Sequence, residues 1–189
     1  MNEKLIQEHI LHYYFPRGVK HMCTNYAGTG FHECDVIGVN PSGLTIEYEI
    51  KISRSDFKND IKKRGKHLRM VNPTSYARYR NHGTPNRFYY VTPVGLIKPE
   101  EVPTYTGLIY VHTSKKVGES IEVIKRAPLI HNNKHGEKLL DGIAQSLTAK
   151  LIYGCSYMNW QRKQPNTYIE SQPTIKGLDN PAQSFFEKL

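Results

Sequence analysis

The sequence has few of the features that mark secreted, zinc-scaffolded or membrane-spanning proteins. Its three cysteines, Cys23, Cys34 and Cys155, are an odd number and form no CxxC pair, which excludes a disulfide scaffold and the usual zinc ribbon. No apolar run reaches the roughly 18–20 residues that a bilayer span needs. The N-terminal stretch lacks the basic start and small-residue cleavage site of a signal peptide. We therefore expect no membrane association and a cytoplasmic location.

Acidic residues are scarce relative to basic ones. The 189 residues include 26 Lys and Arg against 17 Asp and Glu, which gives a formal net charge of +9. Such an excess favours a polyanionic partner, and nucleic acid is favoured over a membrane because no basic helix with an apolar face stands out. With 38% hydrophobic residues, the chain has enough apolar material for a folded domain. We expect that domain to span residues 1–155, with a partly irregular C-terminal extension over 156–189.

The hydrophobic pattern predicts one sheet with helices around it. Helices are expected over residues 2–14, from about residue 55 with Ser53 or Ser55 as its cap and Phe57 and Ile61 as core contacts, and over about 137–153. Strands are expected over residues 19–26, 33–39, 44–53, within 86–97, and over 107–112 and 120–125. Turn chemistry at residues 40–43 pairs the second strand with the third as a hairpin. The predicted fold class is α/β, a central mixed β-sheet flanked by helices.

The clearest alternation in the chain places reactive side chains on one face of this sheet. In the run LTIEYEIKIS, Glu49 and Lys51 project from the same face, roughly 6.6–6.8 Å apart along the strand. The predicted hairpin brings Asp35 of the preceding strand near Glu49. Two carboxylates beside a lysine suit metal-assisted phosphodiester cleavage, because a hard divalent cation prefers oxygen ligands and a lysine can orient the attacking water. Asp35, Glu49 and Lys51 are therefore the candidate catalytic residues.

The sequence CDV, followed by a hairpin and then EYEIK, resembles the D…(D/E)xK signature of the PD-(D/E)xK nuclease superfamily. The predicted element order is also similar to that superfamily's core, although Cys34 stands where proline is frequent. The longer run EIKISRSDFKNDIKK, with FYYVTP and GLIYV, resembles small bacterial and phage proteins related to the MmcB-type DNA-repair proteins. The resemblance covers about residues 30–130. It implies a restriction-endonuclease-like core and a metal-dependent deoxyribonuclease of repair, recombination or phage DNA processing.

The resemblance also implies a cofactor and its ligands. Mg²⁺ or Mn²⁺ would be bound by Asp35, Glu49 and the backbone carbonyl of Ile50, with the lysine of the motif as the catalytic lysine. Many members of the superfamily add a carboxylate from the first helix. Glu8 is the candidate here, because Glu3 lies near the fraying end of that helix. The alternative for Glu8 is a solvated helix residue.

A basic stretch over residues 62–87, rich in turn residues, is expected to bind the nucleic-acid backbone. Lys and Arg side chains neutralise phosphates, and the interleaved Tyr76 and Tyr79 can stack on unpaired bases. The candidate DNA-binding residues are Arg54, Lys62, Lys63, Arg64, Lys66, Arg69, Arg78 and Arg80. The alternative is a solvated, charged helix end. DNA is the expected partner, while RNA, a homodimer and a protein partner stay open.

The acidic residues around the motif also have a structural interpretation. The Glu-x-Glu-x-Lys face can belong to a solvent-exposed strand with diagonal charge pairs. Asp56 and Asp60 are expected to complement the N-terminus of their helix or to pair with Arg64, rather than to approach a metal. Glu47 is expected to flank the site.

Other classes of function fit the sequence less well than a nuclease. His131 and His135 have zinc-pair spacing, but the glycine and asparagines around them predict ordinary loop histidines. A two-carboxylate hydrolase of small substrates, such as a glycosidase, fits poorly with the lysine and the positive charge. The main alternative is a non-catalytic nucleic-acid-binding subunit built on the same scaffold.

Overall fold

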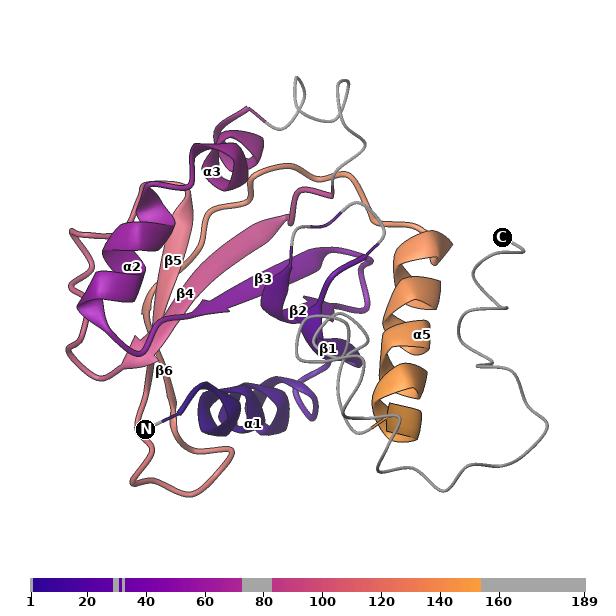
Figure 1. Cartoon of the computed structure of the whole chain (residues 1–189), viewed down its shortest axis with the longest axis horizontal. Coiled ribbons are helices and arrows are strands. Elements are labelled where there is room, and N and C mark those ends of the chain that lie inside the picture. The colour runs from indigo at the N-terminus through magenta and orange to yellow at the C-terminus, as the bar shows by residue number, and fades with distance from the viewer. Residues whose placement is uncertain (1, 29–30, 32, 73–82, 154–189) are drawn as a thin grey trace, which may run out of the picture. The chain divides into compact units, whose positions relative to one another are not determined.

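A single sheet of six strands organises the fold in this computed structural model, which describes residues 2–28, 31, 33–72 and 83–153 (Figure 1). The helices are α1 (Glu3–Tyr14), α2 (Arg54–Ile61), α3 (Arg64–Val71) and α5 (Glu137–Tyr153). The strands are β1 (His21–Tyr26), β2 (Cys34–Val39), β3 (Thr45–Ile50), β4 (Arg87–Pro93), β5 (Thr106–Val111) and β6 (Ile121–Lys125). The predicted extension over 156–189 lies outside the described residues.

The strands lie in the sheet in the order in which they occur along the chain. β2 pairs antiparallel with β1 and β3, and β6 pairs antiparallel with β5. β4 runs parallel to both of its neighbours, β3 and β5. A parallel pair needs a crossover connection, and α2 and α3 lie in the one between β3 and β4. The sheet is therefore mixed, and the predicted α/β class is confirmed.

The turn between β2 and β3 is fixed by its own side chains. Asn40 Oδ1 accepts hydrogen bonds from the backbone N–H groups of Ser42 and Leu44, each at 3.0 Å. Gly43 has a φ of 78°, in the left-handed region that glycine adopts without steric cost. The predicted hairpin is thus confirmed, with turn residues that set its register.

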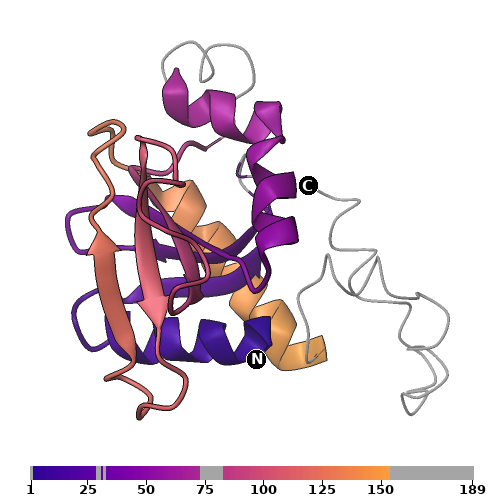
Figure 2. The same cartoon turned by 90° about the vertical axis from the view of Figure 1, so that its left-hand side faces the viewer.

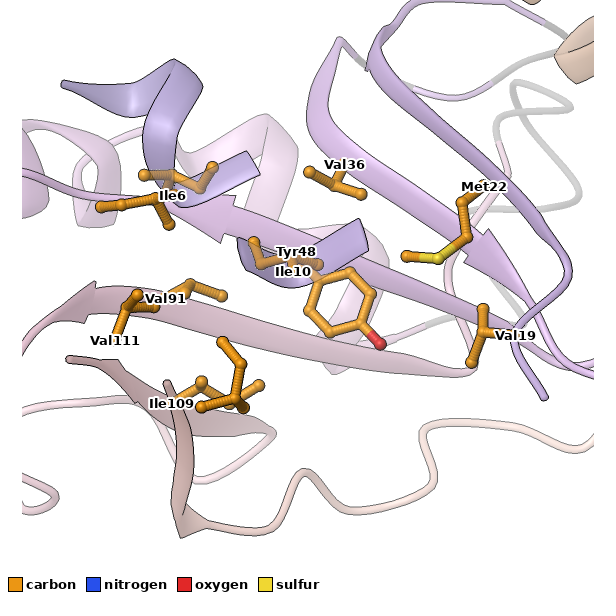
Figure 3. Packing of buried hydrophobic residues seen from close by; sticks show 11 residues of the cluster. Ile6, Ile10, Val19, Met22, Val36, Tyr48, Val91, Ile109 and Val111 are labelled. Carbon is orange, nitrogen blue, oxygen red and sulfur yellow. The ribbon is translucent and has the colours of Figure 1, made fainter. Parts of the chain in front are cut away.

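Each face of the sheet is covered by different helices. On one face, Ile6 and Ile10 of α1 pack against a buried cluster that includes Tyr48, Val91 and Ile109 (Figure 3). On the other face, α2 and α3 cover β4 and β5 through Phe57 and Met70, and α5 covers β1 and β2 through Leu139 and Ile143. Figures 1 and 2 show α1 and α3 on opposite sides of the strands. No helix in the described ranges has the length and apolar character needed to cross a bilayer.

Two details around α2 and α3 differ from the sequence expectation. The basic stretch after residue 62, predicted to be turn-rich, forms helix α3 over Arg64–Val71. Ile61, predicted as a core contact of α2, is 36% exposed, whereas Asp60 is fully buried in its place. Phe57 is buried as predicted, and Ser53 caps the helix by accepting a hydrogen bond from the Asp56 N–H at 3.2 Å.

Candidate active site

The β2–β3 hairpin brings the two predicted carboxylates together. Val36 of β2 lies opposite Tyr48 of β3, and the same register one residue further sets Asp35 opposite Glu49. The backbone N–H of Ile50 donates to Asp35 Oδ2 at 2.6 Å, which fixes the Asp35 side chain across the strand pair. Opposite residues of an antiparallel pair point to the same face of the sheet. Asp35 and Glu49 are therefore neighbours, as the sequence predicts.

Lys51 completes the predicted triplet immediately after β3. Its backbone N–H donates to the carbonyl of Val91 at 3.0 Å, and its Nζ donates to Glu49 Oε1 at 2.8 Å. Glu49 and Lys51 are each only 4% exposed, and Glu47 on the same face is fully buried. The interpretation of this face as a solvent-exposed strand is therefore wrong, because α2 and α3 cover it.

The Asp35 carboxylate is in an unfavourable electrostatic position. Burial and the neighbouring Glu49 raise the pKa of Asp35 to about 8, although the Ile50 N–H opposes this shift. By contrast, burial alone would lower the pKa of Lys51, and Glu49 and Asp60 raise it instead. Lys51 is thus a permanent cation beside Glu49. Asp35 is the acid whose negative charge is left without sufficient compensation.

Glu49 is also held by a second lysine, which comes from α3. Lys66 Nζ lies 2.7 Å from Glu49 Oε2 and 3.3 Å from Asp60 Oδ1, and the residue is only 8% exposed. The expectation that Lys66 contacts a nucleic-acid backbone is wrong, because its ammonium points into the acidic cluster. Burial lowers the pKa of Lys66, but Glu49, Glu47 and Asp60 together raise it above its ordinary value.

Asp60 is part of the same buried cluster. Its carboxylate accepts a hydrogen bond from the Tyr90 hydroxyl at 2.9 Å, and Lys51 Nζ lies 3.8 Å away. Burial would raise the pKa of Asp60, but the contacts with His67, Lys66, Lys51 and Tyr90 hold it well below its ordinary value. Asp60 lies in the last turn of α2, so its predicted role at the helix N-terminus is wrong, whereas a pair with Arg64 stays a prediction because that side chain lies outside the described residues.

Asp56 lies at the solvent-exposed side of the cluster. Its side chain is 50% exposed, and its Oδ2 lies 3.6 Å from Lys51 Nζ. Asp56 also lies in the first turn of α2, where a negative charge complements the helix dipole as the sequence predicts. It therefore lies near both the helix N-terminus and the lysine of the motif, Lys51.

Glu47 and Arg69 form a fully buried ion pair that attaches α3 to β3. Arg69 Nη2 donates to both carboxylate oxygens of Glu47, at 2.7 and 2.8 Å. Arg69 Nη1 donates to the carbonyl of Gly83 at 2.8 Å, and the Thr84 hydroxyl donates to the carbonyl of Arg69 at 3.3 Å. Arg69 is fully buried, so its predicted role as a DNA-binding residue is wrong. It has a positioning role, and Glu47 flanks the site as predicted.

The structure places Gln7 and Glu3 of the first helix toward the motif, rather than the predicted Glu8. Glu8 is exposed on α1, which matches its alternative as a solvated helix residue. Gln7 is buried, and its Nε2 donates to the carbonyl of Asp35 and to Glu3 Oε1, both at 3.2 Å. Loss of hydration raises the pKa of Glu3; Lys51 opposes this shift and Glu49 adds to it. Glu3 therefore replaces Glu8 as the first-helix carboxylate near the motif.

The remaining basic candidates divide into surface residues and residues that are not described. Lys62 and Lys63 are exposed, and Lys63 Nζ lies 3.2 Å from Asp60 Oδ1. Arg54 is exposed and pairs with Glu101. The side chain of Arg64, and the whole of Tyr76, Arg78, Tyr79 and Arg80, lie outside the described residues. A DNA-binding role of Lys62, Lys63 and Arg54 stays a prediction.

The two loop histidines have the ordinary role that the sequence predicts. His131 and His135 direct their Nε2 atoms to the same backbone carbonyl, that of Thr84, at 2.8 and 3.0 Å. Asn86 Nδ2 lies 3.1 Å from His131 Nδ1. These hydrogen bonds fix the loop after β6 against the start of β4.

The donor set of the motif fits a hard divalent cation through two side chains and one backbone group. Within the described ranges, no three His, Cys, Asp or Glu side chains are arranged as a metal site. The predicted set of Asp35, Glu49 and the Ile50 carbonyl has only two such side chains, so it relies on waters or substrate for further ligands. The mutual repulsion of Asp35 and Glu49 is the feature that a bound cation would relieve.

Comparison with known proteins identifies a shared fold. No family model and no curated protein match the chain. A solved structure described as the SPO1766 protein of unknown function from Silicibacter pomeroyi is similar, with a TM-score of 0.53 and 17% sequence identity. The similarity covers 93% of this chain and 98% of that one. At this level of identity the likeness concerns the fold alone, and the resemblance to the nuclease superfamily stays a prediction from sequence.

Proposed function

We propose that the chain is a metal-dependent nuclease that hydrolyses phosphodiester bonds of DNA. The observation that carries this proposal is the meeting of Asp35, Glu49 and Lys51 at the end of β3. The two acids repel each other, while the Lys51 ammonium lies 2.8 Å from Glu49. Repelling carboxylates beside a fixed lysine are what metal-assisted phosphate chemistry requires.

The cofactor of the proposed reaction is Mg²⁺ or Mn²⁺. Asp35, Glu49 and the Ile50 carbonyl would hold it. Glu3 is a candidate for a further ligand, because the Gln7 amide links its carboxylate to the backbone of Asp35. When bound, such a cation polarises the phosphate and makes a coordinated water more acidic. Lys51 holds a permanent positive charge beside the site, so it can orient the attacking water or offset charge that develops on the phosphate.

The charge of the cluster supports a phosphate substrate over a neutral sugar. In the buried cluster, the carboxylates of Glu47, Glu49 and Asp60 are matched in number by the cationic side chains of Lys51, Lys66 and Arg69. Asp35 adds at most one negative charge, so a divalent cation held by Asp35 and Glu49 would make this group of seven side chains positive. A positive cluster attracts a phosphodiester anion and gives no advantage to a neutral glycoside.

The second candidate function is a non-catalytic nucleic-acid-binding subunit on the same scaffold. One observation favours it: each oxygen of Glu49 lies within 2.8 Å of a lysine ammonium, so this acid is neutralised without any metal. Such a protein would still use its positive surface to bind nucleic acid.

A cleavage assay distinguishes the two functions. The purified chain is incubated with labelled single-stranded, duplex and branched DNA and with RNA, in Mg²⁺, Mn²⁺ or EDTA. We expect cleavage only with metal, and a loss of about 10²-fold or more in Lys51→Met, because an electrostatic contact to the reacting phosphate is removed. Lys58→Met is the matched control, since Lys58 is an exposed lysine of α2.

Each outcome of this assay has a defined meaning. If Lys51→Met and Lys58→Met both cleave DNA as fast as the parent, the assignment of Lys51 as a catalytic residue is contradicted. Salt-dependent binding of DNA without cleavage in any metal would favour the binding subunit.

A further inference from the structure

We infer that Lys66 is a built-in competitor of the divalent cation, a lysine of α3 that occupies Glu49 until a metal arrives. The inference rests on the proposed function and concerns the regulation of the same site. Lys66 thereby sets the metal concentration at which the site is loaded.

Lys66 is shared between two acids. Its Nζ lies 2.7 Å from Glu49 Oε2 and donates a hydrogen bond to Asp60 Oδ1 at 3.3 Å. The shorter contact is the one with the predicted metal ligand. A cation that binds this oxygen of Glu49 would therefore displace the Lys66 ammonium from it.

Lys66 has an alternative partner when a divalent cation binds the Glu49 carboxylate. Asp60 is fully buried and holds Lys66 by the hydrogen bond just described, and the ring of Phe88 lies 5.4 Å from the ammonium. Lys66 can thus release Glu49 and keep two favourable contacts. A lysine without such a second acid would be left buried and unpaired, which is strongly unfavourable.

The position of α3 does not depend on Lys66. Arg69 attaches the helix to Glu47, and His67 Nε2 lies 2.9 Å from the carbonyl of Asp60. The Tyr105 hydroxyl lies 2.9 Å from the other ring nitrogen of His67. These contacts hold α3 independently of Lys66, so replacement of Lys66 removes a charge and leaves the helix in place.

The experiment measures Mn²⁺ binding by calorimetry in the full chain and in Lys66→Met. We expect the variant to bind Mn²⁺ about tenfold more tightly or better, because a positive charge next to a ligand oxygen has been removed. Lys63→Met is the matched control. Lys63 also pairs with Asp60, but its side chain is 60% exposed, so its charge is screened by water. Lys66→Gln is tested beside Lys66→Met, and circular dichroism checks that both fold.

A second readout does not depend on activity. The rise in melting temperature on adding Mn²⁺ should be larger for the two Lys66 variants than for the parent, because they are the less stable without metal and bind it better. If the parent binds Mn²⁺ and the folded Lys66 variants bind it equally or more weakly, the inference is overturned. The proposed function is left intact by that result. Failure of the parent itself to bind Mn²⁺ would overturn the proposed function, and the inference with it.

Discussion

At the scale of single residues, Asp35 shows how the candidate site departs from the rest of the core. Most buried charges in the cluster have an opposite charge within about 3 Å, whereas Asp35 has a backbone N–H and a neighbouring acid. Such an arrangement does not help the fold. Under the proposed function, this acid is retained as a ligand of the divalent cation.

Replacing Asp35 with Asn should stabilise the metal-free protein at alkaline pH. The pKa of Asp35 is raised to about 8, so the folded state favours the protonated acid and ionisation lowers stability. The difference between Asp35→Asn and the parent should be small near pH 4, grow up to about pH 8 and then level off. We expect the variant to melt about 2–4 °C higher at pH 9, and the check is thermal unfolding in EDTA across this pH range. A difference that does not change with pH would contradict the raised pKa.

The triplet itself could be predicted from sequence, but its supporting residues could not. A strict two-residue alternation and a short turn are enough to place Asp35, Glu49 and Lys51, because both are local properties of the chain. Lys66 and Asp60 reach the site only through the packing of α2 and α3 onto the sheet. Asp60 lies three residues after the buried Phe57 on the same side of its helix, which is the one sequence signal for it.

At the scale of elements, α3 is the helix that sequence reasoning missed, and its buried side explains why. The side chains that it buries include Lys66, His67 and Arg69, while Leu68 and Val71 are more than half exposed. Hydrophobic periodicity cannot detect a helix whose inner face is charged. The helix is held instead by ion pairs to Glu47 and Glu49 of β3, which is distant in sequence, and to Asp60 of the preceding helix α2.

Arg69→Met should destabilise the protein severely. The substitution leaves Glu47 as a buried carboxylate without its main partner, and breaking one side of a buried ion pair costs about 3–5 kcal/mol of unfolding free energy. The double variant Glu47→Leu/Arg69→Met should recover a large part of this loss, since no unpaired charge remains. Urea unfolding of the two single variants and the double variant measures the coupling. If the double variant is as unstable as the sum of the singles, the pair does not act as proposed.

At the scale of the whole molecule, the charge of +9 is divided between the interior and the surface. Lys51, Lys66 and Arg69 are buried among acids, while residues such as Lys62 and Lys63 remain exposed. Net charge alone therefore overstates the surface available to a polyanion. Two members of the basic surface that the sequence predicts, Lys66 and Arg69, face inward instead.

Lys62→Gln/Lys63→Gln should weaken DNA binding without regard to base sequence. Each lysine that contacts a phosphate contributes about one unit to the slope of log affinity against log salt, so we expect the slope to fall by up to about two. Lys115→Gln/Lys116→Gln is the matched control, because these two lysines are equally exposed between β5 and β6. Fluorescence anisotropy in EDTA at several salt concentrations measures both. An equal effect of the two double variants would indicate attraction by overall charge rather than a contact at residues 62 and 63.

The proposed function requires a divalent cation to bind between the two carboxylates that face each other across β2 and β3. Crystals grown with Mn²⁺ and measured at a wavelength where manganese scatters anomalously give its position directly. We predict an anomalous peak in contact with the carboxylates of Asp35 and Glu49, and its loss in Asp35→Asn. A peak located elsewhere, or the absence of any peak at saturating Mn²⁺, would contradict the account.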